Sequence, residues 1–501
     1  MAASPELIKQ RSIGFLEKYQ VSKVLVNCYG SVTCTAELKH ETIPRTEVNG
    51  DSKVNATHFY LNQLYPAICQ LVQKHPFLSM VLNDYNKPTA HFSQLTRFSL
   101  SKVIDIQESP STTLEEALAS ACDEELINET SALDVPLWRL KIRVDPHVID
   151  QCTIILIVHH VIMDGKSLAI FWNDLLNFLN NSTTTLSTEN YDNDNDNWTV
   201  PIKTLPPMTL ASPFELRELT PKPTVKDYGL LFYKLIRKSI LPTTLQKRLG
   251  YIKELWRGDY PIHEGDTHHT ALHIRQLVGN DWLHLIQLAK HQYKISVHAV
   301  VYAAFLLSWA EFYPNYNTTM STPINYRQLI KANDELGNMV GGYTHTWYSN
   351  VIQDPPLETT STAYVQSDSP LLWRLAAHYY HHLQTKKERA CIDNHFLGLL
   401  KYPGEYCNWW DDFSKESELG RSGGLEHSDL GRFDIASHGA WEVESLYFAQ
   451  SAQMYTTALC LNTITVKDGL YATFTMQDKS LDSAKVAKIL DRFVEILKIK
   501  N

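Results

Sequence analysis

Cysteine is scarce in this chain and never occurs in a metal-binding or redox pair. The 501 residues include eight cysteines, and no two of them are spaced as Cys-x-x-Cys. This pattern excludes a zinc knuckle and gives no support to a disulfide framework. A reducing compartment is the simplest interpretation, so we expect a cytoplasmic protein.

Long apolar segments are missing as well. Residues 1–11 lack the continuous apolar core of a signal peptide. The most apolar window, Val297–Ala310, is short for a membrane span and contains His298. We therefore predict that this window forms a buried helix.

Neither an excess of positive charge nor a phosphate-binding glycine motif is present. The chain has 46 Lys and Arg against 55 Asp and Glu, a formal net charge of −9, which argues against a nucleic-acid surface. The glycines of residues 337–342 lack the Lys-Ser/Thr ending of a P-loop and the spacing of a dinucleotide fingerprint. Residues 420–424 are glycine-rich but lie among polar residues, which indicates a loop. Nucleoside triphosphate and nicotinamide chemistry are therefore not indicated.

The chain is longer than one hydrophobic core normally supports, so two domains are expected. We predict an N-terminal domain over residues 1–205 and a C-terminal domain over residues 206–501. Residues 180–197 contain almost nothing apolar and predict a flexible loop, and a proline-rich crossover follows at 199–223. The order of strand and helix patterns in both halves indicates an α/β fold of layered α+β type.

Several segments have a clear periodicity. Alternation over residues 137–144 predicts a strand that forms a hairpin with the apolar run at 152–158. The remaining predicted elements are helices at 58–74, with a kink at Pro66, and at 230–238, and strands at 77–82, 456–465 and 469–476.

The most informative stretch is the heptad His159-His160-Val161-Ile162-Met163-Asp164-Gly165. It follows the buried strand at 152–158 and precedes an apolar helix at 168–176, so its histidines lie where a rigid strand ends. A neutral imidazole accepts a proton from a hydroxyl or an amine, which contributes about 10²–10⁴-fold in rate. We therefore predict a general base in this heptad.

Asp164 and Gly165 complete the pattern. Asp164 lies four residues after His160, where it either orients the ring or pairs with a distant arginine, and Gly165 fits a position that needs positive φ or close backbone approach. A structural role for the histidine pair is the simpler alternative. Zinc binding is disfavoured because adjacent residues on a strand end point to opposite faces. His378 and His382 have helical i, i+4 spacing but no obvious acidic or cysteine partner, which favours a polar helix face.

Several segments together resemble the fungal alcohol O-acetyltransferase family of the CoA-dependent acyltransferase superfamily, whose motif is HHxxxDG. The heptad is the specific feature, and weaker motifs follow in the right order along nearly the whole chain: His75-Pro76-Phe77-Leu78, Pro136-Leu137-Trp138-Arg139-Leu140, Pro323-Ile324-Asn325-Tyr326-Arg327, Leu336-Gly337-Asn338-Met339-Val340-Gly341 and the strand–helix pattern from Thr456 to Leu497.

The resemblance implies two chloramphenicol-acetyltransferase-like domains with an active-site channel between them. It assigns His160 as the base that deprotonates the acceptor during direct transfer in a ternary complex, with His159 and Gly165 in support. Asp164 would be structural, paired with Arg327 across the domain interface, and a buried carboxylate does need such a partner. Acetyl-CoA would be the co-substrate, with no permanently bound cofactor and no metal.

The chain also departs from its relatives. The Asp-Phe-Gly-Trp-Gly motif of plant members is absent, and Trp441–Tyr447 matches a fungal Ser-Asn-Leu-Gly-like segment only loosely. The acceptor is therefore open. Ester formation on a small or medium alcohol is the leading hypothesis, and N-acetylation of a sphingoid-like or xenobiotic amine uses the same base. A non-catalytic binding protein with this fold is the alternative from another class.

Two terminal stripes raise the question of peripheral membrane association. Fungal relatives sit on the endoplasmic reticulum or lipid droplets through terminal amphipathic helices. Here the C-terminal stripe is flanked by lysines and an arginine, but a last helix packed on its own domain is the preferred interpretation. We expect a monomer. The apolar residues of the two stripes are Val486, Ile489, Leu490, Phe493, Val494 and Leu497, and Ile13, Phe15, Leu16 and Tyr19.

Overall fold

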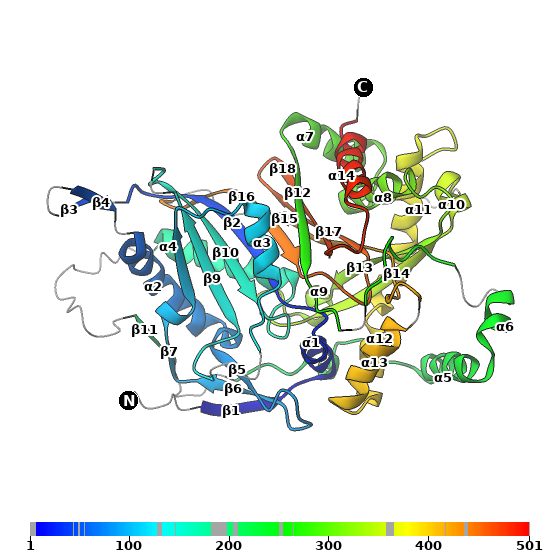
Figure 1. The fold of residues 1–501 in the computed structure, drawn as a ribbon, viewed down its shortest axis with the longest axis horizontal. Helices are drawn as coiled ribbons and strands as arrows, with labels where there is room; N and C mark the ends of the chain where they lie inside the picture. Colours follow the sequence, from blue (N-terminus) through cyan, green and yellow to red (C-terminus); the bar gives the residue numbers. More distant parts are fainter. Residues whose placement is uncertain are drawn as a thin grey trace.

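The architecture comes from a computed structural model, shown in Figure 1. It describes residues 7–43, 45–48, 51–54, 56–127, 133–145, 147–181, 198–203, 209–249, 254–263, 265–356, 365–415, 417–434 and 439–499. The layered α/β fold is confirmed, because two large sheets are each covered by helices. Most of the loop predicted at 180–197 lies outside the described residues.

The first large sheet has five strands in the order β16-β2-β10-β9-β8. The predicted hairpin is confirmed, since β10 pairs antiparallel with β9 and also with β2. Every second residue of β9 is buried, as the alternation predicted. The elements are β2 (Val32–Lys39), β8 (Ile104–Glu108), β9 (Trp138–Val144), β10 (Gln151–Val158), β16 (Glu442–Gln450) and the helices α2 (Ala56–Lys74), α3 (Leu114–Cys122) and α4 (Gly165–Asn181).

The second large sheet has six strands in the order β12-β18-β17-β15-β13-β14. The predicted helix at Val297–Ala310 is confirmed as α8 and lies in the core of this half. The elements are β12 (Thr270–Val278), β13 (Thr318–Asn325), β14 (Val340–Trp347), β15 (Leu425–Phe433), β17 (Leu459–Val466), β18 (Gly469–Gln477) and the helices α7 (Asn280–Gln287), α8, α9 (Arg327–Ile330), α10 (Ser349–Gln353), α11 (Leu371–Lys386) and α14 (Ser483–Leu497).

Strand β16 joins the first sheet although it belongs to the last quarter of the chain. It pairs antiparallel with β2, from Glu442 opposite Lys39 to Gln450 opposite Val32. Segments on both sides of residue 205 therefore share one sheet. The division into domains 1–205 and 206–501 stays a prediction.

Smaller elements connect these layers, and one prediction among them is wrong. The segment 77–82 was expected to be a strand throughout, but Pro76–Ser79 forms a 3₁₀ turn before β5, because Pro76 fixes φ at the first turn position. The smaller elements are β1 (Leu7–Ser12), β3 (Arg45–Val48), β4 (Asp51–Val54), β5 (Met80–Asn83), β6 (His91–Leu95), β7 (Arg97–Ser99), β11 (Thr199–Pro201), α1 (Phe15–Leu25), α5 (Val225–Ile240), α6 (Thr243–Arg248), α12 (Ile392–Phe396) and α13 (Gly404–Ser414).

Both terminal stripes pack inward. Leu490 and Phe493 of α14 are buried, and the Phe493 ring contacts Phe305 and Phe474. Ile13 and Leu16 near the N-terminus are also buried. No single helix in the described ranges has the length and apolarity of a membrane span, although α7 and α8, with the turn between them, pass as a pair bent by 114°.

Candidate active site

The heptad occupies the end of a central strand. Strand β10 lies between β2 and β9, and its residues from Ile154 to Val158 are buried, so it is held on both edges and both faces. The helix α4 begins at Gly165, the last residue of the heptad. The two histidines therefore project from a fixed strand end into the start of a connection, as predicted.

His159 faces the interior. Its side chain is buried, and its Nδ1 accepts a hydrogen bond from the Val161 backbone N–H at 3.0 Å. Burial, with smaller contributions from His160 and Lys23, lowers the pKa of His159 to about 3. A neutral imidazole that bonds its own turn is a structural element, so His159 supports the loop that carries its neighbour.

His160 points the other way and is half-buried. The Asn338 side-chain amide nitrogen lies 3.3 Å from its Nδ1 and donates to the His160 carbonyl oxygen at 3.2 Å. Burial and, to a smaller extent, the positive charge of Lys23 lower the pKa of His160 to about 4. The negative charge of Asp164 and the backbone of His160 and Met163 act in the opposite direction, but their effect is smaller. The ring is therefore neutral at physiological pH, as a proton acceptor must be.

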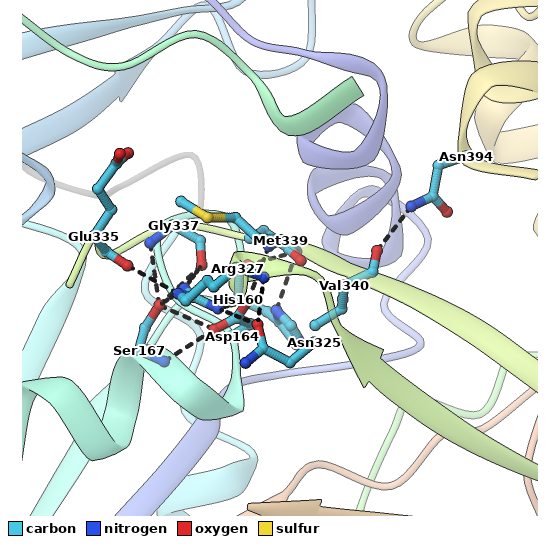
Figure 2. Close-up of polar contacts among 11 residues, drawn as sticks. His160, Asp164, Ser167, Asn325, Arg327, Glu335, Gly337, Met339, Val340 and Asn394 are labelled. Carbon is cyan, nitrogen blue, oxygen red and sulfur yellow. Dashed lines mark hydrogen bonds and ion pairs between the residues drawn. The ribbon is translucent and has the colours of Figure 1, made fainter. Parts of the chain in front are cut away.

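Asp164 pairs with Arg327 and not with the His160 ring (Figure 2). Asp164 Oδ2 lies 2.7 Å from Arg327 Nη1 and accepts the Met339 N–H at 2.9 Å, while Oδ1 accepts the Ser167 N–H and hydroxyl at 2.9 and 3.0 Å. Burial would raise the pKa of Asp164, but the arginine and these donors lower it overall. The carboxylate is thus ionised and saturated with donors.

Arg327 ties the heptad to the second half of the chain. Its guanidinium, 1% exposed, also donates to the Ser167 hydroxyl at 2.7 Å and to the carbonyl oxygens of Gly337 at 3.0 Å and Glu335 at 3.0 Å. A planar fork with this many fixed acceptors has little freedom to move. The pair therefore locks the start of α4 against the segment 335–339.

Gly165 meets the second of its two predicted requirements. It does not have positive φ, but a Cβ atom there would lie 2.3 Å from Leu430 Cδ2. The side chain of β15 thus approaches the backbone at the start of α4. A larger residue at position 165 would have to displace the end of the Leu430 side chain.

A cavity of about 490 Å³ lies beside His160. Asp164 and Gly165 line it from the heptad side, and the rest of its wall comes from α1, β2, β13, β14, β15, β16, the 390–413 region and Gln453. A larger recess of about 780 Å³ between α3 and β12 contains none of the predicted site residues, and carboxylates line it: Glu115, Glu116, Asp123 and Glu124. His160 does not line that recess, and its carboxylates would repel a ligand that carries phosphate groups.

Lys23 of α1 lines the same cavity and is buried. Its Nζ lies 4.3 Å from the ring centroid of Tyr29, 4.9 Å from that of Tyr19 and 5.7 Å from that of Trp410, an aromatic cage for the ammonium. Burial lowers the pKa of Lys23 to about 8, opposed by Cys28 and Glu426. Lys23 is therefore the cation whose charge acts on His160.

Within the described part of the chain, His298, His427 and Asp429 bring three ligand atoms within 4.8 Å of one another. The two imidazole rings are stacked at 4.7 Å and 7°, so their lone pairs lie in parallel planes and do not converge on one ion. His298 already bonds Asp429 at 3.0 Å and Tyr379 at 3.0 Å. This geometry favours a hydrogen-bonded cluster over a metal site.

Two other sequence features lie outside the site. His378 and His382 lie on α11, but His378 is buried against Trp347, so the expected polar helix face is wrong at that position. The letters of residues 420–424 also fit Gly-x-Ser-x-Gly. That segment precedes β15 with no helix following it, so it is not the strained strand-to-helix turn of a nucleophile.

The model of the alcohol acetyltransferase family matches residues 12–500. The chain belongs to the alcohol acetyltransferase family. A relative described as a probable alcohol acetyltransferase, FCK4 of Fusarium pseudograminearum (strain CS3096), is 22% identical over 507 residues, covering 96% of this chain and 93% of the relative. This acetyltransferase is therefore a CoA-dependent enzyme of acyl transfer, with acetyl-CoA as acyl donor.

Solved structures agree on the fold of this acetyltransferase. The trichothecene 15-O-acetyltransferase TRI3 of Fusarium sporotrichioides superposes with a TM-score of 0.64 at 13% identity, over 98% of this chain and 95% of that one. The condensation domain of the monacolin K polyketide synthase MokA has a TM-score of 0.55 at 10% identity, over 99% and 98% of the two chains. At such low identity the likeness concerns architecture only.

Sequence reasoning missed four residues that contact the site of this acetyltransferase. No catalytic or binding motif indicated a role for these residues, which are Lys23, Ser167, Asn338 and Met339. Asn338 and Met339 stand in a segment that supported the family resemblance, which was the only signal. Lys23 gave none, because its place in the cavity depends on how α1 packs.

Proposed function

We propose that this acetyltransferase moves the acetyl group of acetyl-CoA directly to the hydroxyl of an alcohol, with His160 as the general base. The observation that carries the proposal is a neutral imidazole on the wall of a cavity that segments from both halves of the chain enclose. The cavity holds substrates against the ring, and the rigid strand end fixes the ring's position.

The reaction balances without a covalent enzyme intermediate. One ring nitrogen of the neutral His160 carries a proton, and the other takes the hydroxyl proton as the oxygen attacks the thioester carbon. The carbonyl π bond becomes an oxyanion in a tetrahedral intermediate. Its collapse breaks the carbon–sulfur bond, and the imidazolium returns the proton to the departing thiolate, which gives the ester and CoA.

Asp164 and Arg327 act through structure in this scheme. Their ion pair holds the turn after His160 and fixes the segment 335–339, which includes Asn338. Removing either partner therefore moves the base instead of removing a proton acceptor. We expect both kcat and stability to fall in such variants.

The test follows release of free CoA with a thiol reagent while acetyl-CoA is incubated with panels of alcohols and of amines. We expect turnover with alcohols, and His160→Ala to abolish it while the surface variant His291→Ala retains it. Turnover with amines alone would identify an N-acetyltransferase, and no turnover with either panel would favour a binding protein. Mass spectrometry with acetyl-CoA alone should show no acetylated protein.

A further inference from the structure

Two side chains of opposite charge line the cavity beside His160 and are not used by the proposed proton transfer. They are Lys23 of α1 and Glu426 of β15, 7% and 9% exposed. Among the residues that the structure describes, the Lys23 ammonium contacts aromatic rings but has no hydrogen-bond acceptor and no ion-pair partner. A buried ammonium is costly unless its donors are engaged, so this cation is suited to a ligand in the cavity.

Glu426 is held in one orientation by three donors. Its Oε1 accepts from the side-chain amides of Gln450 at 3.0 Å and Gln453 at 2.8 Å, and its Oε2 accepts from the Ser321 hydroxyl at 3.2 Å. A carboxylate has about four acceptor positions, so Oε2 keeps one open within the described part of the chain. The three donor residues also line the cavity, which makes this wall polar.

The Tyr29 ring joins these two groups to the base. Its centroid lies 4.3 Å from Lys23 Nζ and 6.3 Å from the centroid of the His160 ring. Its hydroxyl donates to Gln450 Oε1 at 3.4 Å, and the amide nitrogen of the same glutamine donates to Glu426. The ammonium, the carboxylate and the imidazole therefore gather around one aromatic ring.

A hydroxyl is the group that fits the Lys23 and Glu426 pair. An ammonium only donates hydrogen bonds and a carboxylate only accepts them, whereas one hydroxyl oxygen accepts from the first and donates to the second. A carboxylate on the acceptor would be repelled by Glu426, and an ammonium would be repelled by Lys23. The pair therefore selects a neutral oxygen function.

The opposite wall suits a carbon skeleton. Apolar and aromatic side chains of α1 and α13 line it: Leu16, Tyr19, Trp409 and Phe413. We propose that the acceptor is a neutral diol or polyol, of which one hydroxyl gives its proton to His160 and a second one binds between Lys23 and Glu426. This inference rests on the proposed function and names its substrate class. A site built to bond a second hydroxyl discriminates against an alkanol that lacks it.

The experiment compares 1-hexanol with 1,2-, 1,4- and 1,6-hexanediol, which share one carbon chain, at saturating acetyl-CoA. We expect kcat/KM for at least one diol to exceed that for 1-hexanol at least about tenfold, as for a hydrogen bond to a charged group. Lys23→Met and Glu426→Gln should each bring this ratio toward one. The ratio is informative because a change in the His160 base or in the folded fraction acts on both substrates alike.

Lys141→Met and Glu115→Gln are the matched controls, because both residues line the recess between α3 and β12 and not this cavity. They should keep the ratio. Acetylation of 1-hexanol with no preference for any diol would overturn the inference and leave the proposed function intact, whereas no acetylation of any alcohol would overturn both. A preference that survives both substitutions in the cavity, or a stronger preference for 6-hydroxyhexanoate, would also overturn the inference.

Discussion

Replacing Arg327 with methionine is the most informative perturbation of the framework around His160. The guanidinium is 1% exposed and the Asp164 side chain is fully buried, so the variant leaves an uncompensated charge in the core. Removing one partner of a buried pair costs about 3–5 kcal/mol. The lost bonds from the guanidinium to Ser167, Gly337 and Glu335 add to this cost.

The assay is the free energy of unfolding from urea titrations, followed by tryptophan fluorescence. We expect Arg327→Met to lower it by about 3–5 kcal/mol, and the double variant Asp164→Asn/Arg327→Met to recover part of the loss because the orphaned charge is gone. The pKa of Asp164 is lowered in the folded state, so the contribution of the pair is present above the unfolded pKa and is lost as pH falls through the folded pKa. A loss below about 1 kcal/mol, a value typical of exposed pairs, would refute the reasoning.

Three further predictions concern the cavity. The acid limb of kcat/KM against pH should have its midpoint near 4, because His160 must be neutral to act and its pKa is about 4. A midpoint near about 6.5, the usual pKa of histidine, would contradict this prediction. Lys23→Met removes a cation that lowers this pKa, so the midpoint should move upward, whereas Lys141→Met should leave it unmoved. Gly341→Ala should destabilise the protein by about 1–3 kcal/mol in thermal unfolding, because the added Cβ would lie 2.7 Å from Cys391 Cα. Gly342→Ala is the control, because nothing lies within 4 Å of the Cβ that it would add. Equal effects of the two substitutions would contradict the close contact between Gly341 and Cys391.

Local patterns predicted the elements that carry the heptad. The apolar run before His159 and the alternation at 137–144 each specify a strand through side-chain burial, and β9 and β10 confirm both. The Asp164–Arg327 pair was predicted from the family resemblance. The structure contains it at 2.7 Å, and the need of a buried carboxylate for a cation explains why.

The sequence did not predict strand pairings or burial that depend on contacts between segments far apart in the chain. Strand β16 pairs with β2 across about 400 residues, and no local signal encodes that partner. Helices α14 and α5 both have apolar residues at helical spacing. The apolar side chains of α14 are buried and several of those of α5 are exposed, because neighbouring elements cover only the apolar face of α14. Periodicity predicts that a face is apolar but not what covers it.

The central claim is that the imidazole of His160 takes the proton of a hydroxyl that attacks acetyl-CoA. A single-turnover measurement of acetyl transfer, with excess enzyme over acetyl-CoA and a saturating alcohol, tests it most directly. For His160→Ala we expect a rate at least about 10²–10⁴-fold below that of the unmodified enzyme, with acetyl-CoA binding retained. An unchanged rate of ester formation in this variant would contradict the account.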